Sequence, residues 1–146
     1  MTVLRMDHVS VVVADLEAAI AFFSALGLTV EGRTPVEGPW VDGVNGIYGV
    51  RVEIAMMQTP DGHNKLELTK FFAPELTSPE PDNAPPNTLG LRSVMFAVDD
   101  LEDTVDRLRP HGAELVGKIE RYEDMFLLCY LRGPGGIIVA LAEPLR

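Results

Sequence analysis

An internal repeat constrains the fold of this chain more than any other feature of its sequence. Residues 8–27 (HVSVVVADLEAAIAFFSALG) align without a gap with residues 93–112 (SVMFAVDDLEDTVDRLRPHG). The identical pairs are Val9/Val94, Val13/Val98, Asp15/Asp100, Leu16/Leu101, Glu17/Glu102 and Gly27/Gly112. A repeat of this kind predicts two modules with the same local fold, because matching apolar and capping positions favour the same elements.

Each copy of the repeat predicts a strand followed by a helix. Apolar residues alternate along residues 9–13 and 94–98, which is typical of a strand with one buried face. Asp15 and Asp100 follow as helix N-caps, and Gly27 and Gly112 end the helices. Between them the apolar positions recur with helical spacing. They are Leu16, Ala19, Ile20 and Phe23 in the first copy, and Leu101, Thr104, Val105 and Leu108 in the second.

Three strand-like segments follow each predicted helix, so that both halves read β-α-β-β-β. The segments are 28–33, 50–58 and 65–71 in the first half, and 114–119, 126–131 and 137–142 in the second. Module one is therefore expected over residues 4–72 and module two over residues 90–144. The proline-rich segment 73–89 is expected to be the linker between them. The glycine-rich segment 37–49, which holds Trp40, is predicted to be a long loop of module one.

Charge and cysteine content narrow the function classes. The net charge is −10 and the isoelectric point is about 4.6. Such a surface repels phosphate backbones and anionic lipids, so we expect neither a nucleic-acid partner nor a membrane partner. The apolar run at residues 6–13 is too short to span a bilayer. The single cysteine, Cys129, forms no internal disulfide, and these observations predict a soluble, cytoplasmic protein.

Four segments of the sequence resemble recurring segments of one superfamily. They are DHVSVVVADLEAAIAFFSALGL, TPDGHNKLELTKF, FAVDDLEDTVDRL and GPGGIIVALAEP. The chain is similar to the vicinal-oxygen-chelate superfamily, which includes glyoxalases, bleomycin resistance proteins and dioxygenases. This resemblance implies an α+β fold in which residues 1–146 form one domain. In that domain two paired βαβββ modules form an open, curved-sheet barrel around a cavity. It also implies a small-molecule ligand and a homodimer.

The resemblance implies a divalent-metal site that is only half retained. The family's four ligand positions fall on His8 and Glu67 in module one and on Ser93 and Ala140 in module two. The repeat pairs these positions independently, because His8 aligns with Ser93 and the LEL of residues 66–68 aligns with the VAL of residues 139–141. Only His8 and Glu67 are good ligands, so we expect weak binding of a divalent metal. Glu143 lies an odd number of residues from Ala140 and is expected on the opposite face.

The missing ligands exclude some activities of the superfamily more strongly than others. An extradiol dioxygenase needs two histidines and one carboxylate around iron. In this chain the resemblance places those ligands at His8, Ser93 and Ala140, so extradiol chemistry is not expected. A glyoxalase-like lyase or isomerase remains open.

Glu67 is the strongest candidate for a catalytic residue. A carboxylate between Leu66 and Leu68 in a strand is costly unless it is paired or hydrated. We expect it to be a metal ligand or a general base, and the alternative is a salt bridge, for instance to Lys65 or to an arginine. His8 is expected to be a metal ligand, and the alternative is a hydrogen-bonded histidine in a cavity wall. The predicted ligand-binding residues are Ser10, Trp40, Met56, Ser93 and Met95.

Two functions remain open from the sequence. The first is a lyase or isomerase that passes through an enolate-like intermediate, with Glu67 in proton transfer and His8 as a ligand or orienting group. The second is a non-catalytic protein that binds and sequesters an antibiotic or a metabolite. The retained His8–Glu67 pair favours the enzyme, and the loss of half of the ligands favours the binding protein.

Overall fold

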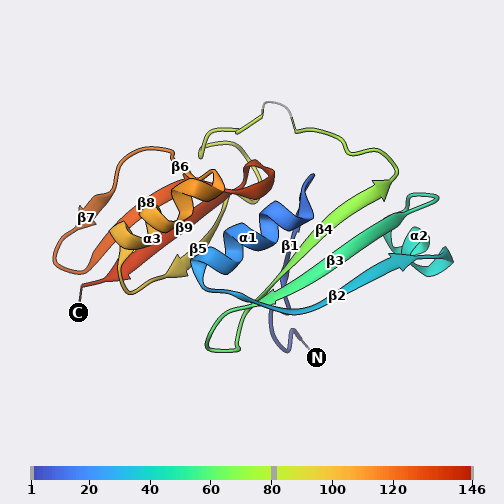
Figure 1. Ribbon diagram of the computed structural model, residues 1–146, viewed down its shortest axis with the longest axis horizontal. Coiled ribbons are helices and arrows are strands. Elements are labelled where there is room, and N and C mark those ends of the chain that lie inside the picture. Colours follow the sequence, from blue (N-terminus) through green and yellow to red (C-terminus); the bar gives the residue numbers. More distant parts are fainter. Residues whose placement is uncertain (1, 80–81, 146) are drawn as a thin grey trace. The chain divides into compact units, whose positions relative to one another are not determined.

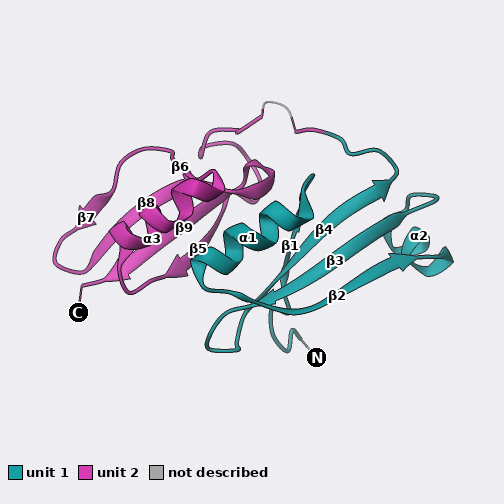
Figure 2. Cartoon of the chain, viewed as in Figure 1, with its two compact units in different colours: residues 1–77 teal, residues 78–146 magenta. Residues whose placement is uncertain are grey.

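The computed structural model describes residues 2–79 and 82–145 and has an α+β fold, as predicted. One compact unit ends at Thr77 and the other begins at Ser78, within the segment predicted as the linker (Figure 2). Each unit contains one sheet and one principal helix (Figure 1). No helix in the described part of the chain combines the length and the apolar character needed to cross a membrane.

Unit 1 has a four-stranded sheet in the order β1-β4-β3-β2. Its elements are β1 (Val9–Val12), α1 (Leu16–Leu26), β2 (Thr29–Glu37), α2 (Pro39–Asn45), β3 (Arg51–Gln58) and β4 (Lys65–Ala73). β1 and β4 are parallel, and the other neighbouring strands are antiparallel. Helix α1 packs on one face of this sheet, where Leu66 and Leu68 of β4 are buried. The opposite face of β4 carries Glu67.

Unit 2 repeats this topology with a five-stranded sheet in the order β5-β9-β8-β6, and β7 also pairs with β8. Its elements are β5 (Ser93–Ala97), α3 (Leu101–Leu108), the short 3-10 helix η1 (Arg109–His111), β6 (Glu114–Leu115), β7 (Glu120–Tyr122), β8 (Phe126–Arg132), the 3-10 turn η2 (Pro134–Gly136) and β9 (Ile138–Pro144). The single strand predicted over 114–119 is wrong. The chain bends at Val116 and Gly117 after β6, and glycine in a strand favours such an interruption.

The strand register agrees with the sequence repeat. Ser10 of β1 lies opposite Glu67 of β4, and its aligned residue Met95 of β5 lies opposite Ala140 of β9. The equivalence of Glu67 and Ala140, expected from the sequence, is therefore confirmed by backbone pairing.

Both predicted N-caps are confirmed. The Asp15 carboxylate accepts a hydrogen bond from the Ala18 backbone N–H at 3.0 Å, and the Asp100 carboxylate accepts one from Asp103 at the same distance. The apolar stripe of α3 is buried as predicted. The stripe of α1 is shifted from the prediction, because Ile20 is only half-buried and Phe22 is buried instead.

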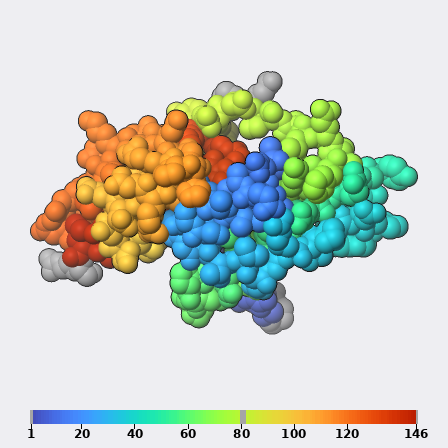
Figure 3. All heavy atoms as spheres, in the orientation of Figure 1, coloured from blue at the N-terminus to red at the C-terminus, as the bar shows by residue number. Residues whose placement is uncertain are grey.

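The loop predicted over residues 37–49 is wrong, because this segment contains helix α2. Pro39 occupies the first turn of α2, where its missing N–H costs nothing. The Asp42 carboxylate accepts hydrogen bonds from the backbone N–H groups of Gly49 (3.0 Å) and Val50 (2.8 Å). These hydrogen bonds connect α2 to the two residues that directly precede β3. Figure 3 shows this segment, in cyan and teal, at the surface of unit 1.

Candidate functional site

Glu67 is held in place by two hydroxyl groups on the open face of the unit 1 sheet. The Ser10 hydroxyl donates to Glu67 Oε1 at 3.1 Å, across the parallel β1–β4 pair. The Thr69 hydroxyl, two residues along β4, donates to the same oxygen at 3.1 Å. About 20% of the Glu67 side chain is exposed to solvent. Both hydroxyl groups bind Oε1, so Oε2 is left for a different partner.

That partner is His8, whose Nε2 lies 3.5 Å from Glu67 Oε2. The other ring nitrogen, Nδ1, lies 2.8 Å from Asp7 Oδ2. The hydrogen bond with His8 and a second one from Arg5 hold the pKa of Asp7 below its usual value. Ionised Asp7 accepts a hydrogen bond, which assigns a proton to Nδ1 of His8. In the neutral imidazole, Nε2 then presents its lone pair towards Glu67.

The salt bridge considered as an alternative for Glu67 is absent from the described part of the chain. Lys65, the nearest basic residue along β4, pairs with Glu31 at 3.1 Å. The only ionisable partner of Glu67 among the described residues is His8. The structure therefore brings His8 and Glu67 together as the sequence predicted, and it removes the Lys65–Glu67 pair.

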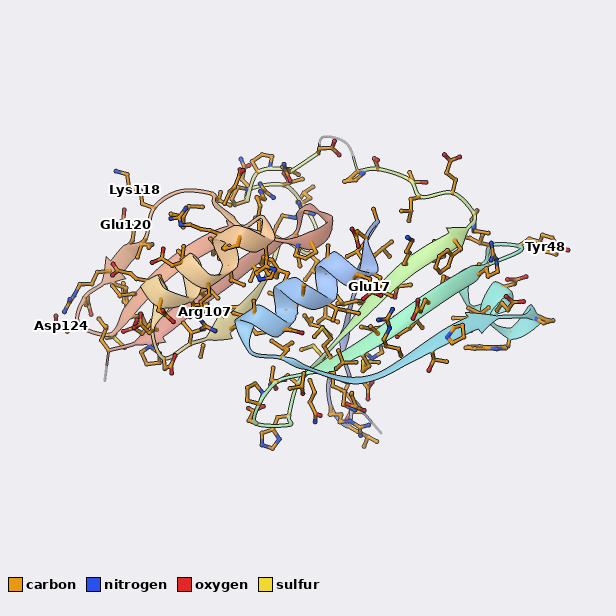
Figure 4. All side chains as sticks on the ribbon, viewed as in Figure 1. Glu17, Tyr48, Arg107, Lys118, Glu120 and Asp124 are labelled. Carbon is orange, nitrogen blue, oxygen red and sulfur yellow. The ribbon has the colours of Figure 1, made fainter. Side chains whose placement is uncertain are left out.

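Helix α2 covers one end of the face that carries Glu67. Phe71 follows Glu67 and Thr69 along the same side of β4 and packs in a cluster of apolar side chains. The cluster consists of Val36, Val41, Val50, Val52, Ile54 and Phe71. Val41 supplies the contact from α2, and its neighbour Trp40 is 64% exposed. Tyr48, in the loop that follows α2, points away from the unit at its outer end (Figure 4).

Met56 is the other predicted ligand-binding residue on this face of unit 1. It lies opposite Glu67 in the antiparallel β3–β4 pair and is half-buried. Ser10 and Met56 thus flank Glu67 from its two neighbouring strands. Ser10, Met56 and Glu67 are therefore adjacent in the sheet, whereas His8 directly precedes β1 and Trp40 lies in α2.

The matching positions of unit 2 form an apolar surface. Ala140 is fully buried and lies between Met95 of β5 and Tyr130 of β8, both of which are exposed. Ser93, which aligns with His8, is half-buried at the start of β5. Glu143 lies on the helix side of the sheet, as expected, and its carboxylate accepts a hydrogen bond from the Leu101 N–H at 2.7 Å. Glu143 therefore caps the start of α3, and it does not lie at the position expected for a metal ligand.

The donor atoms of unit 1 fit two ligands of a divalent ion. Two ligand atoms that are each about 2.1 Å from one ion, at a tetrahedral angle, lie about 3.4 Å apart. The separation between His8 Nε2 and Glu67 Oε2 is 3.5 Å. Asp7 stands behind the imidazole, in the place of the carboxylate that commonly orients a metal-binding histidine. Among the described residues, no group of three or more His, Cys, Asp and Glu side chains has the geometry of a metal site.

Asp7 is the site residue that sequence reasoning missed. Its position directly before His8 was visible, but neighbouring residues in a strand point to opposite faces. β1 begins only at Val9, so this alternation does not separate Asp7 from His8. Cys129, by contrast, is buried and lies outside this site. Burial raises the pKa of its thiol to about 11, which removes it as a nucleophile at neutral pH.

Comparison with known families places this arrangement of sheets in a defined class. The Glyoxalase/Bleomycin resistance protein/Dioxygenase superfamily matches residues 5–141. The chain belongs to this superfamily. Among curated proteins no significant match was found.

Solved structures agree with this assignment. A glyoxalase family protein from Bacillus cereus is 49% identical, with a TM-score of 0.94 over 100% of this chain and 97% of that chain. An antibiotic binding protein from Streptomyces shares the fold at 19% identity, with a TM-score of 0.62 over 99% of this chain and 98% of that chain. A glyoxalase family protein from Enterococcus faecalis is also 19% identical, with a TM-score of 0.63 over 96% of this chain and 98% of that chain.

Proposed function

We propose that the protein binds a small molecule and moves a proton on it, as a lyase or isomerase, with Glu67 as the catalytic residue. The observation that carries this proposal is the array Asp7–His8–Glu67, with 2.8 Å between the first pair and 3.5 Å between the second. His8 Nε2 and Glu67 Oε2, two atoms that can each hold a proton, lie close together, and both side chains are partly exposed. Such a pair is suited to hold a proton or a cation between them.

The two oxygens of the Glu67 carboxylate have different partners, and this difference supports a role in proton transfer. Oε1 is held by the hydroxyl groups of Ser10 and Thr69, so the carboxylate has one fixed orientation. Oε2 accepts no hydrogen bond from them and is the atom that takes a proton from a bound ligand. A general base acts at hydrogen-bond distance from the proton it removes. His8, oriented by Asp7, binds the ligand oxygen beside the reacting carbon.

His8 and Glu67 are also the residues that would hold a divalent metal. Such an ion would polarise the oxygens of the ligand as a Lewis acid. Where Glu67 binds the ion, it is not free to act as the base in the same step. We propose Ser10, Met56 and Trp40 of module one as further ligand contacts, and Ser93 and Met95 remain the predicted contacts of module two. We place the protein in the cytoplasm as a homodimer, and its single, buried thiol fits a reducing compartment.

Proton exchange in D₂O tests this function without knowledge of the natural substrate. A panel of α-hydroxy carbonyl compounds, 2-substituted thioesters and hemithioacetals is incubated with the protein. The loss of the proton next to the carbonyl group is followed by NMR. We expect catalysed exchange for at least one class, and a rate lower by roughly 10²–10⁴ in Glu67→Gln.

The matched control is His63→Ala, since His63 lies in the exposed turn between β3 and β4. This variant should exchange at the wild-type rate. Equal rates in wild type and Glu67→Gln, or no exchange across the panel, would refute the catalytic proposal.

The second candidate, a protein that sequesters its ligand, is favoured by the apolar surface of unit 2. Exposed Met95 and Tyr130 beside Ala140 offer contact area but no acid or base. In this case a ligand is bound and recovered unchanged. Glu67→Gln then alters affinity by only about 0.5–1.5 kcal/mol, the value of one hydrogen bond. Recovery of intact ligand from a tight complex would select this candidate.

A further inference from the structure

Arg92 directly precedes Ser93 and aligns with Asp7 in the sequence repeat. The two modules therefore place opposite charges at the same point, one residue before the position of His8 and Ser93. In unit 1 the charged residue has partners, because Asp7 forms hydrogen bonds with both His8 and Arg5. In unit 2, Arg92 has no such partner among the described residues.

Arg92 is the one arginine in the described part of the chain for which no hydrogen bond, ion pair or ring contact is found. Its Nε atom is enclosed and has no hydrogen-bond partner. The residue as a whole is half-buried, and its Nη2 lies close to Gly90. Among the nitrogens of the Arg92 guanidinium, only Nε is enclosed without a partner.

The other described arginines all have partners, as expected in an acidic chain. Arg33 binds both Glu17 and Glu53, and Glu17 projects from α1 (Figure 4). Arg132 donates to the backbone carbonyl groups of Asn83, Ala84 and Gly136. Acidic residues outnumber basic ones by 22 to 12, so carboxylates are not scarce. The enclosed Nε–H of Arg92, which no described carboxylate contacts, has lost hydration without gaining a partner.

We propose that Arg92 binds a small-molecule oxyanion, a carboxylate or a phosphate group. The planar guanidinium has donors that match either group in a two-point contact. The oxyanion supplies the partner that the protein lacks, and Arg92 offsets the repulsion of an anionic ligand by a chain of net charge −10. The inference rests on the proposed function only in taking the ligand to be a small molecule. It requires no chemistry at Glu67.

The test is a titration of the full chain with sodium phosphate and, separately, sodium acetate, with sodium chloride at equal ionic strength as the reference. The side-chain Nε–H NMR signal of Arg92 reports binding directly. We expect a saturable shift with phosphate or acetate and none with chloride. The anion with the tighter dissociation constant identifies the group that the ligand carries.

Arg92→Gln should weaken the binding of that anion by roughly tenfold or more, the effect of losing a charge-assisted hydrogen bond. Backbone amide signals follow binding in this variant. Arg92→Lys keeps the charge but loses the two-point contact, so it should bind with intermediate affinity. Arg109→Gln is the matched control, since Arg109 is an exposed arginine of the same unit with a carboxylate partner. It should bind as wild type does.

Urea unfolding in chloride buffer should show Arg92→Gln to be as stable as wild type, because no partner is lost. A strongly destabilised Arg92→Gln would show a structural role and overturn the proposal. So would wild-type protein without a saturable response, or Arg92→Gln titrating as wild type does. Glu67→Gln should keep anion binding while losing proton exchange, so failure of one proposal is distinguished from failure of the other.

Discussion

The two units share one strand register, yet the acidic residue of each lies on a different side of its sheet. In unit 1, β4 presents Glu67 on the face opposite α1, beside the hydroxyl groups of Ser10 and Thr69. In unit 2 the matching residue of β9 is the buried Ala140, and the carboxylate is three residues further along, at Glu143. Glu143 binds the first N–H group of α3. The same strand arrangement thus carries the His8–Glu67 pair in one copy and a helix cap in the other.

This difference shows that the repeat specifies the fold without specifying the chemistry. Backbone pairing and apolar spacing are satisfied in both copies, whereas the polar contacts of each copy depend on a few side chains that differ between them. Substitutions that exchange features between the units therefore test whether the asymmetry is as strict as the contacts indicate.

The largest effect is expected from placing the acid of unit 1 in unit 2. Ala140→Glu would bury a carboxylate that has no described partner, and the free energy of unfolding should fall by about 3 kcal/mol. Urea denaturation measures this difference. Ala97→Glu is the control, because Ala97 is an exposed position of the same sheet, and its effect should stay within about 0.5 kcal/mol. An Ala140→Glu variant as stable as wild type would show that unit 2 can accept the missing ligand.

A smaller effect is expected from the residue that orients His8. Calorimetric titration with Zn²⁺ should detect weak binding, because unit 1 offers two protein ligands. Asp7→Asn should weaken this binding by roughly 10–100-fold, through loss of the carboxylate that holds the imidazole. Asp106→Asn, at an exposed position on α3, should leave the affinity unchanged. Zinc binding that is insensitive to both Asp7→Asn and His8→Ala would place the ion elsewhere.

The smallest effect concerns the helix starts. Asp15 caps α1 alone, whereas α3 has Asp100 and also Glu143. Asp15→Ala should lower the free energy of unfolding by about 1 kcal/mol, and Asp100→Ala by less, since Glu143 still places a carboxylate at that helix terminus. Urea denaturation compares the two, and the double variant Asp100→Ala/Glu143→Gln should lose more than either single change. Equal losses for Asp15→Ala and Asp100→Ala would show that Glu143 adds nothing.

Features encoded locally were predictable from the sequence. The caps at Asp15 and Asp100 depend on residues within one helical turn, and the side of the sheet occupied by Glu143 follows from strand alternation. The proximity of His8 and Glu67 needed more, because they lie in different strands. The repeat and the family resemblance together supplied the register that joins them, and the 3.5 Å separation confirms it.

Features that depend on tertiary packing were missed. The segment around Trp40 was predicted as a loop because of its glycines, but burial of Val41 against Val50 and Val52 stabilises helix α2. Burial of Phe22 in place of Ile20 likewise reflects how α1 lies on its sheet, which helical spacing alone does not determine. The role of Asp7 depends on where β1 begins, and strand boundaries are weakly encoded.

The parallel pairing of β1 with β4 has a consequence for how the chain reaches its fold. The hydrogen bond from Ser10 to Glu67 joins residues 57 positions apart, so the first strand of unit 1 pairs with the last. Bringing the ends of so long a segment together costs chain entropy before any stabilising contact forms, and topologies of this kind fold slowly. Every strand of this sheet is nevertheless synthesised by Ala73, before β5 begins. On a growing chain, the contacts that create the His8–Glu67 site are therefore available before any strand of the second sheet exists.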